Sequence, residues 1–340
     1  MKVPVLLMVF NRLNCVQKVF EPIRQYQPNK LYIAADGPRK DCPADVEKCN
    51  LVREWLLNNI DWQCDVHTLF REKNVGCGYG PSGAISWFFE SEEEGIIIED
   101  DCVMHIDFFD YCAELLEHYR NNKQIMAING FSLQSHSWGR ASYYFSMQNS
   151  GFLGWATWRR AWQYFDFDLE GYNRNSIEHS MHYYNATKQE IKWWGDIYDN
   201  LKKGIYGTSA WDYQWIFTIW KQHGYTIMPN VNLSYNVGFG VDATHTTGTN
   251  DPIACREVEP ILPLMHPEHI SYCREADLYY HKLYYAPHQI SVPWYIRLKR
   301  TIKNNKLFRG LCCTFIERHM CCFLGIRHKR YRNIRKSCVC

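Results

Sequence analysis

Three consecutive carboxylates, Glu99, Asp100 and Asp101, end an apolar stretch in the segment GIIIEDD at 95–101. Acids this close repel one another, so they cannot all ionise unless a cation or hydrogen-bond donors lie between them. Carboxylate oxygens are the ligands that hard divalent cations prefer, and ligands of open α/β sheets bind at the carboxyl ends of strands. The segment therefore predicts a site for Mn²⁺ or Mg²⁺ at a strand end, although a solvated acidic turn would have the same composition.

A further candidate carboxylate, Asp212, lies in SAWDYQW at 209–215. Between Trp211 and Trp215 it would be partly desolvated, an environment that suits a carboxylate to take a proton from a hydroxyl. Ser209 and Asp212 also have the spacing of a capping box, so Asp212 could serve only to begin a helix. The two roles are compatible.

Two more polar positions, Asn11-Arg12 and Asp36, follow predicted strands. A nucleotide across that sheet edge would use them for base and ribose, with the metal at its phosphates. Asp36 also suits a turn in the Asp-Gly-Pro segment. The chain has neither a GxxxxGK[ST] loop nor a GxGxxG between strand and helix, so we expect the metal and side chains to bind the phosphates.

The loop GFGVDATHTTG at 238–248 has glycines at both ends and suits a lid that closes over a ligand. Its His245 is a candidate ligand contact, but a single histidine in such a loop is also commonly solvated.

These residues depend on a regular alternation of strands and helices in the first part of the chain. Strands are predicted at 3–10, 31–35, 66–70, 95–101 and 127–132, and helices at 15–25, 43–59, 82–92 and 107–119, with Asp107 as a cap and a Gly-rich loop at 76–83. This alternation predicts an α/β fold with a mostly parallel sheet flanked by helices. From Trp138 onward the chain is aromatic-rich, which favours a surface that stacks on sugar rings or an ordinary core.

The net charge of +2 is unevenly distributed. Residues 297–340 contain 13 Lys or Arg and one acid, Glu317, so they carry +12 and the rest carries −10. We expect an acidic catalytic domain at 1–285, with a nucleotide-binding half at 1–130 and an acceptor half at 131–285, followed by a basic, helical and amphipathic tail at 286–340.

The fifteen cysteines are scattered and odd in number, and Met1 and Lys2 lead straight into an apolar run. We therefore expect reduced thiols, no secretion leader and a cytoplasmic protein.

Four motifs, in this order after VPVLLMVFNR, resemble the inverting β-1,2-N-acetylglucosaminyltransferases and bacterial nucleotide-diphospho-sugar transferases of the glycosyltransferase A fold. They are EDDCVMHIDFFDY at 99–111, GFLGWATWRRAW at 151–162, WDYQW at 211–215 and GFG at 238–240. The likeness covers about residues 3–250. It implies a glycosyltransferase A fold and transfer of a hexosyl or N-acetylhexosaminyl group in polysaccharide biosynthesis.

The resemblance also implies roles for individual residues. Asp101 would bind the metal directly, while Glu99 and Asp100 would contact metal, ribose or donor sugar. Arg12 and Asp36 would hold the nucleotide.

By the same resemblance, Asp212 would be the catalytic base, and the loop around His245 would order over the donor. The partners would be a nucleotide-diphosphate sugar and a glycan or lipid-linked acceptor. Residues 76–89 lack the family's donor contacts in a form that can be matched, and the tail has no counterpart, so the donor is not identified.

Two other functions fit parts of the pattern. A sugar-phosphate nucleotidyltransferase shares the sheet and the metal, but it would need a Gly-rich basic signature near the first strand, and VFNRLNC at 9–15 has none. A non-catalytic sugar-binding protein would explain the aromatic residues and the basic tail.

The basic tail is expected to bind anionic membrane surfaces rather than nucleic acid, because its charges alternate with large apolar residues. Each Lys or Arg near such a surface contributes about 1 kcal/mol. The full chain should therefore sediment with anionic vesicles at low salt and less at high salt, whereas a chain ended after Tyr285 should remain in the supernatant. Equal recovery of both chains in the supernatant would refute the membrane hypothesis.

Overall fold

The computed structural model describes residues 2–134, 137–147, 152–205, 210–238 and 256–284. The chain divides into two units, Met1–Lys282 and Leu283–Cys340, and the first contains every strand described below. The predicted tail, like His245, lies outside the described residues, so both remain predictions.

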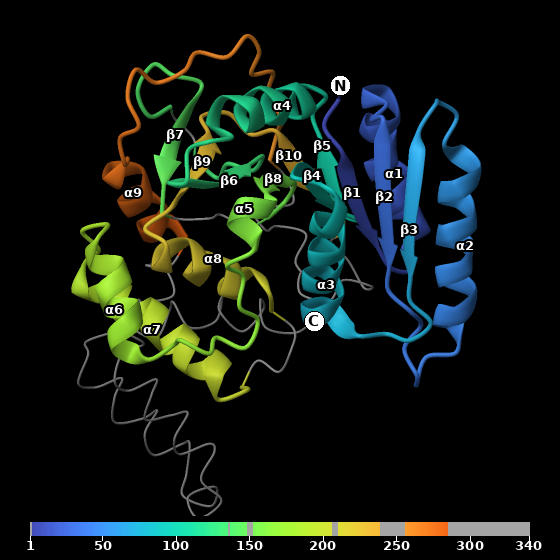
Figure 1. The fold of residues 1–340 in the computed structure, drawn as a ribbon, viewed down its shortest axis with the longest axis horizontal. Helices are drawn as coiled ribbons and strands as arrows, with labels where there is room; N and C mark the ends of the chain where they lie inside the picture. The colour runs from blue at the N-terminus through green and yellow to red at the C-terminus, as the bar shows by residue number, and fades with distance from the viewer. Residues whose placement is uncertain (1, 135–136, 148–151, 206–209, 239–255, 285–340) are drawn as a thin grey trace, which may run out of the picture. The chain divides into compact units, whose positions relative to one another are not determined.

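An eight-stranded sheet with the order β3-β2-β1-β4-β8-β6-β9-β7 forms the centre of the first unit (Figure 1). Its strands are β1 Val5–Val9, β2 Lys30–Ala35, β3 Asp65–Phe70, β4 Glu94–Glu99, β6 Ile125–Asn129, β7 Tyr143–Ser146, β8 Trp155–Trp158 and β9 Tyr225–Pro229. Only β8 and β7 of these run antiparallel to their neighbours. A separate antiparallel pair joins β5 Cys102–Met104 to β10 Ser234–Asn236.

Helices flank the sheet. They are α1 Leu13–Tyr26, α2 Ala44–Asn59, α3 Gly76–Ser91, α4 Asp107–Tyr119, α5 Arg159–Trp162, α6 Arg174–His182, α7 Lys188–Lys202, α8 Asp212–Lys221 and α9 Arg274–Tyr284. α3 contacts β1, while α4 contacts β4, β6 and β8. In Figure 1 α3 lies in front of β1 and β4, whereas α4 lies along the top of the view. The predicted α/β fold with a mostly parallel sheet flanked by helices is confirmed.

The buried faces follow the sequence pattern. Every residue of β1 is buried, as expected of a continuous apolar strand covered on both sides. α1 buries Val16, Val19, Phe20 and Ile23, which recur at helical spacing on one face. None of the helices in the described part of the chain is long and apolar enough to cross a membrane.

The predicted loop at 76–83 is wrong, because these residues form the first two turns of α3. The start of this helix is capped from another part of the chain: the Asp36 carboxylate accepts hydrogen bonds from the backbone N–H groups of Val75 and Gly76, at 3.1 Å each. An acceptor at a helix N-terminus satisfies donors that have no partner within the helix. This distant cap outweighs the low helix propensity of the glycines.

The prediction that Asp107 caps a helix is also wrong. It is the first residue of α4, after Ile106 in the cap position, which makes no side-chain capping bond. The Asp107 carboxylate instead accepts a hydrogen bond from the backbone N–H of Ile261 at 3.0 Å. This hydrogen bond holds the segment around Ile261 and does not cap the start of α4.

A buried carboxylate, Asp277, attaches α9 to the end of β7. It accepts hydrogen bonds from the Ser146 hydroxyl and from the backbone N–H of Met147, the latter at 3.0 Å. Only 1% of Asp277 is exposed, and burial raises its pKa to about 6 despite these hydrogen bonds. The folded protein therefore favours its protonated form more than the unfolded chain does.

We expect Asp277→Asn to change how stability depends on pH. Because the folded-state pKa is raised, the contribution of Asp277 to the free energy of unfolding is fully present below pH ~4 and is lost as pH rises through about 6. This loss is at most about 3 kcal/mol. Urea denaturation at several pH values should show that the free energy of unfolding falls less for the variant than for the wild type as pH rises from about 4 to about 6. The exposed control Asp41→Asn should follow the wild type, and a constant difference between Asp277→Asn and the wild type would contradict the assignment.

Candidate active site

The carboxyl ends of β1, β2 and β4 meet at one edge of the sheet. β1 pairs in parallel with both neighbours, with Met8 opposite Glu99 and Val9 opposite Ala35. The polar residues that follow these strands therefore share an edge, as predicted. Asp212 reaches the same edge from α8, since its charge acts on Glu99.

Arg12 lies between two of the acids. Its Nη2 is 3.0 Å from Asp101 Oδ2 and also forms an ion pair with the Asp100 carboxylate. Asp100 is 5% exposed, and its other oxygen accepts a hydrogen bond from the backbone N–H of Phe10 at 3.3 Å. Burial opposes a charged guanidinium, but the charges of Asp100 and Asp101 outweigh it and raise the pKa of Arg12. Arg12 binds the acids in this structure, and the contact with a nucleotide that the resemblance implied remains a prediction.

One arginine does not balance the negative charge at this edge. The pKa of Glu99 is raised to about 8. Burial is the largest cause, and the charges of Asp101, Asp100 and Asp212 raise the pKa further. Burial likewise raises the pKa of Asp100, although Arg12 opposes the change. An additional cation would relieve this repulsion.

Asp212 is the first residue of α8, and Trp211 occupies the cap position without a side-chain capping bond. Asp212 therefore does not take the third helical position that the capping-box interpretation required, while Ser209 lies outside the described residues. Trp211 and Trp215, which flank it, are buried and contact the ring of Trp155. The aromatic residues fix the start of α8 beside the strand-end acids.

Asp36 is fully engaged with the backbone. Besides capping α3, its carboxylate accepts a hydrogen bond from the N–H of Gly37 at 2.8 Å. Asn11 donates a hydrogen bond to Asp45 at 2.8 Å and so connects the end of β1 to α2. In this structure Asp36 and Asn11 position neighbouring segments, and a contact of either with a nucleotide remains a prediction.

Two residues of the edge were missed as site components. Gly238 lies against Asp101, because a Cβ at this position would be 2.5 Å from Asp101 Oδ2 and 2.7 Å from Arg12 Nη1. Cys77 lies close enough to Glu99 and Asp212 for their charges to add to the effect of burial, which raises its pKa. The position of Gly238 in the glycine-bounded loop could have indicated a close approach; nothing in the sequence indicated Cys77.

No group of three or more His, Cys, Asp or Glu side chains within the described ranges is arranged to hold a metal ion. Mg²⁺ and Mn²⁺ sites of nucleotide-dependent enzymes, however, commonly use one or two carboxylates and complete their coordination with water and phosphate oxygens. Asp101, next to buried acids of raised pKa, fits such a partial site. Its carboxylate has two contacts, with Arg12 and with the Cys102 thiol.

No protein-family model and no curated protein matches the chain. Among solved structures, the mannosyltransferase PcManGT from Pyrobaculum calidifontis, in complex with GDP-Man and Mn²⁺, has a TM-score of 0.33 and 13% identity, over 46% of this chain and 44% of its own. Residues 1–349 of S. aureus TarS have a TM-score of 0.33 and 11% identity, over 47% of each chain.

HddC from Yersinia pseudotuberculosis has a TM-score of 0.31 and 9% identity, over 49% of this chain and 84% of its own. The chain thus spans less than half of the length of the first two structures.

Removal of the Arg12 charge should destabilise the protein, because it leaves buried carboxylates without their partner. Arg12→Gln should lower the free energy of unfolding by about 3 kcal/mol. Arg24→Gln is the matched control, since it breaks the solvent-exposed pair with Asp61 and should have little effect. Chemical denaturation of both variants measures the difference, and equal stability of the two would contradict this account of the acidic edge.

Proposed function

We propose that the chain is a metal-dependent inverting glycosyltransferase, which moves a sugar from a nucleotide-diphosphate donor to a hydroxyl of a glycan or lipid-linked acceptor. The observation that carries this proposal is that Asp212 lies close enough to Glu99, the first of the three strand-end acids, for its charge to act on this carboxylate. A site for a metal-bound diphosphate and a separate carboxylate for proton removal would then share one sheet edge.

Asp212 accepts the proton of the acceptor hydroxyl as its oxygen bonds to the anomeric carbon. The bond from that carbon to the diphosphate oxygen breaks at the opposite face, so the configuration inverts and the nucleotide diphosphate leaves with the electron pair. General-base catalysis contributes about a hundredfold to ten-thousandfold.

Asp101 would hold the divalent metal, with Glu99 and Asp100 contributing negative charge beside it. When bound, the metal offsets charge that develops on the leaving diphosphate. Arg12 is the cation that holds Asp100 and Asp101 in place, and Gly238 allows the segment after β10 to pass close to them.

The alternative enzyme is a sugar-phosphate nucleotidyltransferase, which needs a metal at the acidic edge of the sheet but no base for an acceptor hydroxyl. The position of Asp212 beside this edge favours glycosyl transfer. We also propose that the enzyme is cytoplasmic and that its basic tail brings it to the inner face of a membrane.

A donor screen with Mn²⁺ that follows release of nucleotide diphosphate tests the proposal. With the active donor, Asp212→Asn should lower transfer at least about a hundredfold, because the amide cannot accept the proton. Donor affinity should remain unchanged. Asp110→Asn, on the exposed side of α4, is the control and should retain full activity. Full transfer by Asp212→Asn would rule out the base, and release of pyrophosphate from a nucleoside triphosphate would instead indicate the nucleotidyltransferase.

A further inference from the structure

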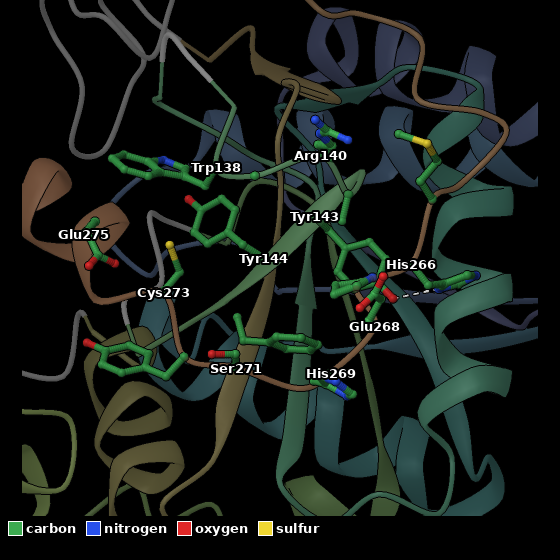
Figure 2. A pocket seen from close by; sticks show the side chains of 16 residues that line it. Trp138, Arg140, Tyr143, Tyr144, His266, Glu268, His269, Ser271, Cys273 and Glu275 are labelled. Atoms are coloured by element: carbon green, nitrogen blue, oxygen red, sulfur yellow. Dashed lines mark hydrogen bonds between the residues drawn. The ribbon is translucent and has the colours of Figure 1, made fainter.

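A groove of about 760 Å³ lies beside β7, between this edge strand and residues 265–275 (Figure 2). Tyr143, Tyr144 and Phe145 of β7 line it, and each is at most 5% exposed. The volume is within the range of sites that bind small molecules. Nothing in the proposed reaction uses this groove.

The groove forms because the neighbouring segment bows away from β7. The Ser142 N–H donates to the Met265 carbonyl at 2.8 Å, and the Cys273 N–H donates to the Phe145 carbonyl at 2.9 Å. Three positions, from Ser142 to Phe145, separate the two contacts on the side of β7, whereas eight positions separate them on the other segment. The additional residues form a wall opposite the middle of β7.

Both walls are held by specific contacts. On the bowed segment, His266 Nδ1 is 2.7 Å from the Tyr143 hydroxyl and Nε2 is 2.8 Å from Glu114 Oε1. On the other side, the backbone N–H of Trp138 donates to Asn230 at 2.8 Å, and its ring meets the edge of Tyr279 at 5.9 Å between centroids. Such a site is largely preformed, so binding requires little ordering of the walls.

The groove is separate from the acidic edge. β7 is four strand positions from β4, which corresponds to about 19 Å at the usual strand spacing. A ligand in the groove is therefore not the sugar that reacts beside Asp212.

We propose that this groove binds a neutral oligosaccharide. The groove is also lined by the half-buried aromatic side chains of Trp138 and Tyr272 and by polar side chains at its exposed rim. This lining matches a sugar, which presents apolar ring faces and many hydroxyl groups. The rim carries Arg140 and two acids, Glu268 and Glu275. The net negative charge of these three side chains disfavours phosphates. An added peptide strand would need a longer run of edge, because the contacts of Ser142 and Phe145 already occupy both ends.

A glycan array probed with the full-length chain tests the proposal, followed by calorimetric titration of the best-bound oligosaccharide. His269 lines the groove and is exposed, so His269→Trp should fill the groove without disturbing the core. We expect this variant to bind the oligosaccharide at least about tenfold more weakly, since it removes the space for a sugar ring. His182→Trp, at an exposed position of α6, is the matched control and should bind like the wild type.

The proposal does not depend on the enzymatic assignment. Asp212→Asn should bind the oligosaccharide normally, and His269→Trp should still release nucleotide diphosphate at the wild-type rate in the absence of acceptor. Absence of binding to every glycan of the array, or binding that Asp212→Asn abolishes and His269→Trp does not, would overturn it. Capture of a phosphorylated sugar or a peptide in the groove, in place of a neutral glycan, would overturn it equally.

Discussion

Mutual repulsion among carboxylates at the end of β4 is the constraint on which the candidate site depends. Glu99, Asp100 and Asp101 are consecutive, and the charge of Asp212 adds to theirs. Arg12 is the basic side chain seen to form ion pairs with two of them within the described residues. Because it contacts Asp100 and Asp101 while Glu99 retains a raised pKa, the edge is stable enough to form but still favours a further cation.

The surrounding structure holds these charges close together. The parallel pairing of β1 with β4 places Arg12 and the acids at the same level of the sheet. Gly238 leaves room for the chain after β10 to pass against Asp101 and Arg12, where any side chain would collide. The cluster of Trp155, Trp211 and Trp215 fixes the start of α8. The aromatic residues after Trp138 thus act here mainly as core.

The parallel sheet and its polar edge could be predicted from sequence, because strands buried on both faces are continuous apolar runs and parallel strands end together. The start of α3 could not be predicted from sequence, because the residue that caps it, Asp36, lies some forty residues earlier in the chain. The approach of Asp212 to Glu99 was likewise hidden, as residues more than a hundred positions apart meet only through the order of the strands. Local spacing in SAWDYQW suggested a capping box, whereas the aromatic packing sets where α8 begins.

The central claim is that the acidic edge binds a divalent cation together with a nucleotide diphosphate. Calorimetric titration of Mn²⁺ into the protein, with and without GDP, UDP, CDP or ADP, tests it most directly. The account predicts that one of these nucleotides strengthens Mn²⁺ binding and that Asp101→Asn weakens it at least about tenfold, since even residues that only orient metal ligands have effects of this size. Nucleotide diphosphate binding that is unchanged in excess chelator, and equal in Asp101→Asn, would contradict it.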